Sequence, residues 1–271
     1  MLCTDKRLDS TEHDSRHFIQ ELGLDPDQIS GNQVRHSAIE TLSKISQDQL
    51  AQIVQKSQFQ EWLGSLDSEA IFVNCPSSAQ LGATPAAYLC NELTNAISCE
   101  QERILSLKFS CREHRSASDP QYGATGILKG LIAQLLLQLP ELNTSSLRKP
   151  RKRHNSEFDI LCSNFESLIC ELAPEIIIFC AIEDINAQEE NERLRDEFED
   201  VVEFLIELTE LRGHSVFKLL IACSWNSKNL WKRMPDPQRT VLWIPSSVPS
   251  QGGMTATKWK AFLEKHIRLL A

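Results

Sequence analysis

The sequence predicts an α/β domain of three layers, in which helices cover both faces of a five-stranded, mostly parallel sheet. The first reason is that short apolar runs rich in β-branched residues alternate with helix-length amphipathic segments. The second is that the runs at 175–182 and 216–223 are interpreted as apolar throughout, which is typical of strands buried on both faces. The third is the length of 271 residues, which suffices for one such domain with a helical lead-in.

The chain divides into four segments in this prediction. Residues 1–33 are polar with few apolar side chains, so we expect a loosely attached N-terminal arm. In residues 34–66 apolar side chains recur every three or four positions, which is typical of one or two amphipathic helices. Residues 67–250 hold the sheet, and residues 251–271 close the chain with a helix.

Each expected strand is followed by a turn or by a segment with helical periodicity. The strands are expected at 70–75, 103–110, 175–182, 216–223 and 240–244. The first helix after a strand begins at Thr84-Pro85, because Thr caps helices well and Pro fits the first helical position. We expect the strand at 70–75 to be central, between the strands at 175–182 and 216–223.

The composition is that of a folded, acidic protein. Hydrophobic residues make up 41% and charged residues 24% of the chain, and the net charge is −9. This charge disfavours nucleic acid as a partner, because clustered Lys and Arg bind the phosphate backbone. No apolar run approaches the roughly 18 residues of a membrane span, and the charged N-terminus has no signal-peptide stretch. The sequence therefore predicts a cytoplasmic protein without a membrane partner.

The nine cysteines are expected to be reduced thiols rather than disulfides or metal ligands. Their number is odd, and no two have the C-x-x-C spacing. Several lie within apolar runs, where a cysteine packs as a small hydrophobe in a reducing compartment. Cys111 and His114 are three positions apart, but no second pair follows at zinc-finger spacing. No metal site is predicted.

The loop after the first strand is the first candidate site, because ligands of open parallel sheets bind at the carboxyl ends of the strands. A phosphate-binding P-loop reads G-x-x-x-x-G-K-[ST], and its Lys reaches the β- and γ-phosphates while its hydroxyl binds Mg²⁺. Aligned on Thr84, this chain keeps Gly82 but has Ser77 and Ala83 in place of the first Gly and the Lys. Ser78 is a further candidate in this loop, which contains no Lys or Arg. The same residues also suit an ordinary loop with a Thr-Pro cap.

The ends of two later strands supply the other candidates. Glu183 and Asp184 follow the strand at 175–182, where an acid of a second nucleotide-binding motif would hold Mg²⁺. Ser224 follows the strand at 216–223, where a polar side chain could contact a terminal phosphate. The alternatives are a solvated acidic loop at the first position and a simple turn at the second.

A basic segment, LRKPRKRHNS at 147–156, separates two amphipathic helices. We expect it to be an exposed, mobile linker, because charge runs are usually solvated. Neutralising its Arg and Lys residues should then leave folding intact. A nuclear-localisation signal at Lys149–Arg153 is the alternative.

The ordered set of segments resembles the fungal NACHT-like, signal-transduction ATPase (STAND) domains of the nephrocystin-3-like N-terminal type. The segments that carry the resemblance span about residues 50–250 and are FQEWLGS, FSCREH, YGATGILKGLIAQLLLQL, IIIFCAIEDINAQEE and VFKLLIACS. The resemblance implies a five-stranded P-loop NTPase core and, in full-length relatives, a nucleotide-driven switch. The departures are Ala83 for the Lys, Glu183 for an Asp and Asp184 for a Gly, and no Arg follows Ser224.

These departures favour a domain that has lost the catalytic function. The preferred hypothesis is a regulatory or protein-interaction module that is not an enzyme and has no resident cofactor, with weak binding of ATP or ADP and Mg²⁺ at most. Its partners would be other proteins or other domains of a longer chain. The second hypothesis is a slow ATP- or GTP-hydrolysing switch with an atypical P-loop. The third is an unrelated α/β enzyme, which a deep pocket away from the first loop would favour.

Overall fold

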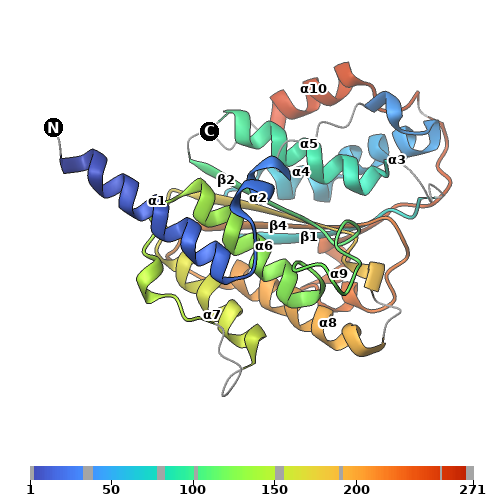
Figure 1. Cartoon of the computed structure of the whole chain (residues 1–271). Coiled ribbons are helices and arrows are strands. Elements are labelled where there is room, and N and C mark those ends of the chain that lie inside the picture. Colours follow the sequence, from blue (N-terminus) through green and yellow to red (C-terminus); the bar gives the residue numbers. More distant parts are fainter. Residues whose placement is uncertain are drawn as a thin grey trace.

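The computed structural model has a five-stranded sheet with helices on both faces (Figure 1). It describes residues 3–32, 39–77, 83–100, 103–149, 156–188, 192–250 and 252–266. The strands are β1 (Glu69–Asn74), β2 (Ile104–Ser110), β3 (Ile177–Glu183), β4 (Val216–Cys223) and β5 (Val241–Trp243). Their order is β2-β3-β4-β1-β5, and all four pairings are parallel. The predicted class, an α/β domain of three layers around a five-stranded parallel sheet, is confirmed.

The position of β1 within the sheet differs from the prediction. The central strand is β4, and β1 lies between β4 and β5 rather than between β4 and β3. Both β3 and β4 are buried over nearly their whole length, so apolar composition cannot decide which of them is central. The edge strand β5 is short and pairs only with Phe72–Asn74 of β1.

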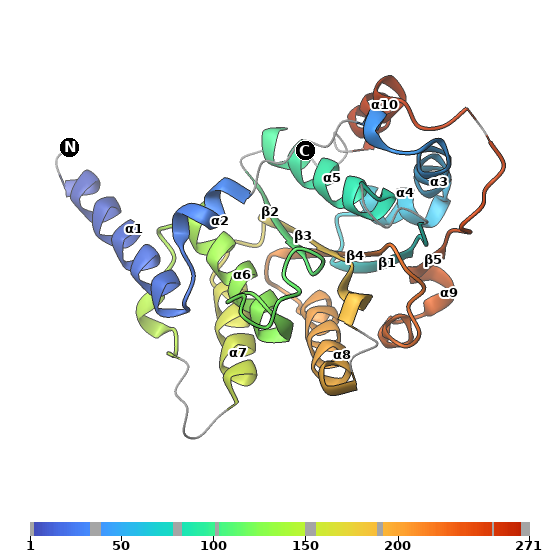
Figure 2. The same cartoon turned by 45° about the vertical axis from the view of Figure 1, so that its right-hand side comes forward.

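One face of the sheet is covered by a layer of four helices, which Figure 2 shows above the strands. They are α3 (Lys44–Gln55), α4 (Ser57–Gly64), α5 (Pro85–Glu100) and α10 (Ala256–His266). Ile71 and Val73 of β1 point into this layer, as the alternation of side chains along a strand requires. Ser43 caps α3, because its hydroxyl accepts the Ser46 N–H at 3.1 Å.

The opposite face is covered by three helices below the strands (Figures 1 and 2). They are α6 (Gly123–Gln138), α7 (Glu157–Cys170) and α8 (Glu192–Glu207). Ala70 and Phe72 of β1 point toward this side. The sequence of α6 is apolar nearly all round and predicts burial on two sides. The structure agrees, because α6 contacts β2 on one side and α1, α2 and α7 on others.

The N-terminal segment is not the loosely attached arm that its polar composition predicted. It forms α1 (Cys3–Glu21) and α2 (Pro26–Asn32), and both helices contact α6. Phe18, Ile19 and Leu22 are buried in the core beneath them. A helix needs only a narrow apolar stripe to pack, and here the stripe is confined to the end of a long polar helix.

Short helical turns connect the main elements. They are η1 (Ile39–Thr41), η2 (Thr144–Ser146), η3 (Ile185–Gln188), η4 (Leu208–Glu210), η5 (Leu230–Arg233) and the four-residue helix α9 (Pro237–Thr240). In the described part of the chain, no helix has the length and hydropathy needed to cross a bilayer.

The predicted basic linker at 147–156 is only partly described, because residues 150–155 lie outside the described ranges. Its first residue, Leu147, is buried in the core. Lys149 Nζ lies 2.5 Å from a carboxylate oxygen of Glu21 at the end of α1. The start of the linker is therefore attached to the N-terminal helices, while the proposed exposure and mobility of residues 150–155 stay a prediction.

Candidate functional site

The carboxyl ends of β1, β3 and β4 bring most of the predicted site residues to one edge of the sheet. The described ones are Ser77, Ala83, Thr84, Glu183, Asp184 and Ser224. Ser78 and Gly82 lie outside the described residues. Since β4 lies between β3 and β1, the turn that follows β4 can bond to the tips of both neighbours. That turn, Ser224–Ser227, is the centre of the site.

Thr84 has the capping role that its sequence context predicts. Its hydroxyl accepts the Ala87 N–H at 3.1 Å and its carbonyl accepts the Tyr88 N–H at 2.9 Å, so it begins α5. Ser224 Oγ donates to Thr84 Oγ1 at 2.7 Å, and both side chains are buried. The hydroxyl that would bind Mg²⁺ in a P-loop is therefore already engaged by Ser224.

Asp184 joins the tips of β3 and β4. Its N–H donates to the Ala222 carbonyl at 2.8 Å, and its Oδ1 accepts the Ser224 N–H at 2.6 Å. Its φ of 53° lies in the left-handed region, which Asp tolerates better than most residues. The side chain is fully buried, and its Oδ2 has no hydrogen-bond partner among the described residues.

Burial raises the pKa of Asp184 above its ordinary value. The hydrogen bonds from Ser224 oppose that rise, as do the positive charges of Arg112 and Arg115. Both arginines belong to the loop between β2 and α6. The guanidinium of Arg115 lies 4.7 Å from the ring centroid of Trp225, next to Ser224. The positive charges that act on Asp184 thus come from the loop after β2, not from the loop after β1.

Glu183 is the last residue of β3 and is 5% exposed. Burial is the main cause that raises its pKa to about 7, and the adjacent Asp184 adds to the rise. A hydrogen bond from Ser110 and the charge of Lys108 oppose it. Lys108 Nζ itself donates to Asn91 Oδ1 at 2.7 Å. A carboxyl that holds its proton near neutral pH is poorly suited to bind a divalent cation.

Two asparagines that the sequence did not single out hold the turn after β4. Asn74, at the end of β1, accepts the Ser227 N–H at 3.0 Å and donates to Asn226 Oδ1 at 3.2 Å. Asn186, just beyond β3, donates to the Trp225 carbonyl at 2.8 Å. The sequence shows each Asn at or just after the end of a strand. It does not show that these side chains bond to the turn after β4, because that depends on which strands are neighbours in the sheet.

These residues do not fit a Mg²⁺–triphosphate as a P-loop does. Ala83 supplies no charge where the Lys would stand, and the Thr84 hydroxyl is bonded to Ser224. Burial keeps Glu183 from ionising readily, whereas Asp184 Oδ2 remains an open acceptor. Within the described residues, no group of three or more His, Cys, Asp or Glu side chains could hold a metal ion.

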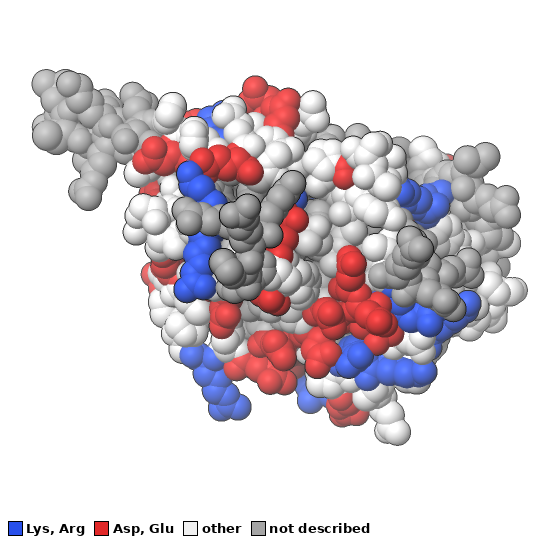
Figure 3. Space-filling model, turned by 60° about the horizontal axis from the view of Figure 1, so that its bottom comes forward, with Lys and Arg blue, Asp and Glu red and all other residues white. Residues whose placement is uncertain are grey.

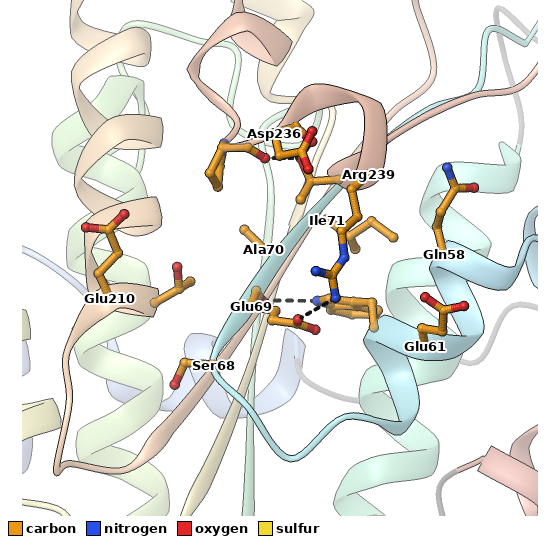
Figure 4. Close-up of a pocket in the computed structure, with 13 residues that line it drawn as sticks. Gln58, Glu61, Ser68, Glu69, Ala70, Ile71, Glu210, Asp236 and Arg239 are labelled. Atoms are coloured by element: carbon orange, nitrogen blue, oxygen red, sulfur yellow. Dashed lines mark hydrogen bonds and ion pairs between the residues drawn. The ribbon is translucent and has the colours of Figure 1, made fainter.

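A cavity of about 290 Å³ lies at the opposite, amino end of β1. Its lining comes from α4, β1, η4 and α9 and includes Trp62, Ser68, Ala70 and several acids (Figure 4). The third hypothesis anticipates a pocket away from the first loop, and this cavity is such a pocket. Its lining holds four carboxylates, one arginine and the hydroxyls of Ser68, Thr209 and Thr240.

Lys218 lies behind this cavity and corrects the prediction that 216–223 is fully apolar. It is 1% exposed, and its Nζ donates to the carbonyls of Ser65 and Asp67 at 3.1 and 3.2 Å. It also lies 3.7 Å from Glu69 and 5.4 Å from the centroid of the Trp62 ring. Burial lowers its pKa to about 8, and the charge of Glu69 opposes this effect. Lys218 thus fixes the loop between α4 and β1.

Charged side chains on the face with α7 and α8 are mixed in sign. Figure 3 shows a group of acidic side chains on this face, with Lys and Arg in separate groups around it. Asp196 and Glu197 of α8 are exposed, whereas Arg233 donates to Glu199 at 2.7 Å and to Glu203 at 2.9 Å. The acids near the start of α8 are therefore surface charges, which a helix N-terminus favours.

Comparison with known proteins finds a distant structural similarity. The chain matches no protein-family model and no curated protein. Among solved structures it is similar to the Aeropyrum pernix ORC1 protein in complex with DNA, with 12% sequence identity and a TM-score of 0.41. The match covers 84% of this chain and 50% of that chain, so this chain spans half the length of that protein. A similarity of this size says nothing about the function of this chain.

Proposed function

We propose that this chain is a P-loop NTPase-like domain that acts as a regulatory or protein-interaction module and does not hydrolyse nucleotide. The observation that carries the proposal is the mutual engagement of the strand-end groups. Ser224 bonds through its hydroxyl to Thr84 and through its N–H to Asp184. The sequence resemblance to NACHT-like STAND domains supports the same function, because it extends over the sheet while the Lys is replaced by Ala83.

The missing lysine decides the expected affinity for nucleotide. A charge-assisted hydrogen bond contributes ~1.5–3 kcal/mol, so its loss weakens binding roughly ten- to a hundredfold. The N-terminus of α5 still attracts an anion, but an exposed helix end contributes only ~0.3–1 kcal/mol. Hydrolysis suffers further, since the developing charge of the transition state loses the same cation. We expect affinity in the millimolar range and no turnover.

The test uses the purified protein without added nucleotide. Extraction and chromatography should find no bound ADP or ATP, and a phosphate-release assay should find no hydrolysis. Ala83→Lys should strengthen ATP binding in calorimetry without restoring turnover, because Ser77 still occupies the first Gly position. Co-purified nucleotide, or ATP hydrolysis that Glu183→Gln abolishes, would overturn the proposal.

A specific observation keeps the slow NTPase as the second candidate. The charges of Arg112 and Arg115 act on Asp184 and oppose the rise of its pKa by burial, and Asp184 Oδ2 has no hydrogen-bond partner among the described residues. The two guanidinium groups could replace part of the missing P-loop charge. This candidate requires that Arg112→Gln with Arg115→Gln weakens ATP binding at least tenfold without changing the melting temperature. The preferred function requires that ATP binding stays as weak as in the wild type.

A further inference from the structure

The cavity at the amino end of β1 borders a length of sheet edge that no strand among the described residues covers. On this side β5 pairs only with Phe72–Asn74, so Glu69–Ile71 have no described neighbouring strand there. Ala70 and Ile71 are 4% and 1% exposed, so this edge lies within the wall of the cavity and not on the open surface. The Ile244 N–H donates to the Asn74 carbonyl, so Asn74 turns its peptide groups toward β5. Alternate residues of a strand point the same way, so Ala70 also turns its peptide groups toward the cavity, which it lines. A free strand edge is a template for pairing with another chain.

The walls of the cavity are acidic. Glu61, Glu69, Glu210 and Asp236 line it, against Arg239 as the one basic side chain of the lining. In Figure 4, Glu61 lies on α4 to one side of β1 and Glu210 lies on the other side. A segment that pairs with β1 between these walls would be favoured by a positive side chain.

Arg239 places its guanidinium beside a carboxylate in this cavity. It extends from α9 toward Glu69 and places Nη2 3.6 Å from Oε1 of that carboxylate (Figure 4). Its side chain is 67% exposed, so the contact is weak and open to exchange. A second link across the cavity is the hydrogen bond from Gln58 Nε2 to the Gln238 carbonyl at 3.2 Å, which is also exposed.

We propose that this cavity docks a short extended segment of a protein partner that carries an Arg or Lys side chain. The segment lies beside Glu69–Ile71 and bonds to the backbone N–H and carbonyl of Ala70, and its cation replaces Arg239 beside Glu69. The inference rests on the proposed function as an interaction module and names the surface and the partner chemistry. Specificity comes from the acidic walls, since an acidic side chain at the same position would meet like charge.

The test measures fluorescence polarisation of a labelled pentapeptide with one arginine between valines and threonines. Two matched peptides replace the arginine by glutamate or methylate the backbone nitrogens that face β1. We expect the arginine peptide to bind at least about tenfold more tightly than either, because each lacks a charge-assisted or backbone hydrogen bond. Arg239→Gln should tighten its binding about three- to tenfold by removing the internal competitor.

The variants are chosen so that folding does not confuse the result. Glu69→Gln also removes a contact of Lys218, so Glu61→Gln with Glu210→Gln, both exposed, serves as the weakening variant. Glu264→Gln on α10 is the control and should bind like the wild type. Equal binding of the arginine and glutamate peptides, indifference to backbone methylation, or unchanged affinity in Arg239→Gln would each overturn the proposal. ATP hydrolysis by the same preparation would contradict the proposed function while leaving the peptide result readable.

Discussion

The polar side chains around the two ends of β1 are arranged differently. At the carboxyl end, Thr84, Asp184 and Ser224 are buried and bond to one another. At the amino end, four acids and one arginine line an open cavity beside the part of β1 that β5 does not pair with. At the usual ligand end of a parallel sheet, the hydroxyl and backbone groups of this chain thus bond to one another, although Asp184 Oδ2, Asn186 Oδ1 and Ser227 Oγ have no hydrogen-bond partner among the described residues. The opposite end borders an open cavity instead.

The difference follows from the neighbours of each end. The carboxyl end of β1 has β4 on one side and β5 on the other, and the turn after β4 reaches both β1 and β3. The amino end has β4 on one side only, because α9 precedes β5 and shortens it. The short edge strand β5 thus leaves a cavity at the amino end of β1, and the turn after β4 occupies the carboxyl end with its own hydrogen bonds.

The largest expected effect comes from a variant that tests how tightly α6 packs against the loop after β2. A Cβ added to Gly126 in α6 would lie 2.0 Å from the Gln121 carbonyl oxygen, in the loop that carries Arg112 and Arg115. Because backbone must move to relieve this clash, Gly126→Ala should lower the free energy of unfolding by about 3 kcal/mol or more in urea denaturation.

The matched control for that variant is Gly213→Ala. Gly213 has a φ of +79° and no atom within 4 Å of an added Cβ, so only the backbone conformation is penalised, by about 1 kcal/mol. Similar losses in both variants would mean that the loop after β2 is not packed against α6, and the contrast between the two ends would weaken.

The next effect is on pH dependence and has opposite signs at the two ends. Burial raises the pKa of Glu183 from 4.5 to about 7, so the folded state keeps the proton longer and stability falls as pH rises through that window. Each pKa unit corresponds to about 1.4 kcal/mol, so the free energy of unfolding should fall by roughly 3 kcal/mol across this pH window. Glu183→Gln should remove this fall. Urea unfolding at pH 4.5 to 8 measures the difference from the wild type.

Lys218, at the amino end, should give stability the opposite dependence on pH. Burial lowers its pKa from 10.5 to about 8, so its folded state loses the proton more easily and stability falls as pH drops from 10.5 to 8. Lys218→Met should remove this slope and leave the Glu183 window unchanged. If Glu183→Gln follows the wild type between pH 4.5 and 7, the carboxyl end is more hydrated than its burial indicates.

Much of the fold and part of the site were predictable from the sequence. Runs of β-branched residues located every strand, and the Thr84-Pro85 pair located the start of α5, because both signals are local. The central position of β4 was not predictable, since two buried strands have the same composition. Asn74 and Asn186 were missed for the same reason, because their use depends on which strand tips are adjacent.

The amino-end cavity had no sequence signal at all. It exists because β5 begins opposite Phe72, and register between distant strands leaves no local pattern. Lys218 was the nearest clue, since a lysine within an apolar strand must find partners when it is buried. Its neighbours Glu69 and Trp62 then lead to the cavity wall.

The smallest expected effect concerns Arg239. Its contact with Glu69 is 3.6 Å long, and the two side chains are 67% and 31% exposed, so it should contribute under about 1 kcal/mol to stability. Arg239→Gln should therefore change the melting temperature by no more than about 3 °C. Lys260→Gln, which breaks another exposed ion pair on α10, should behave alike. A clearly larger loss for Arg239→Gln would make Arg239 a structural clamp rather than a replaceable cation. The proposed docking surface would then lose its displaceable occupant.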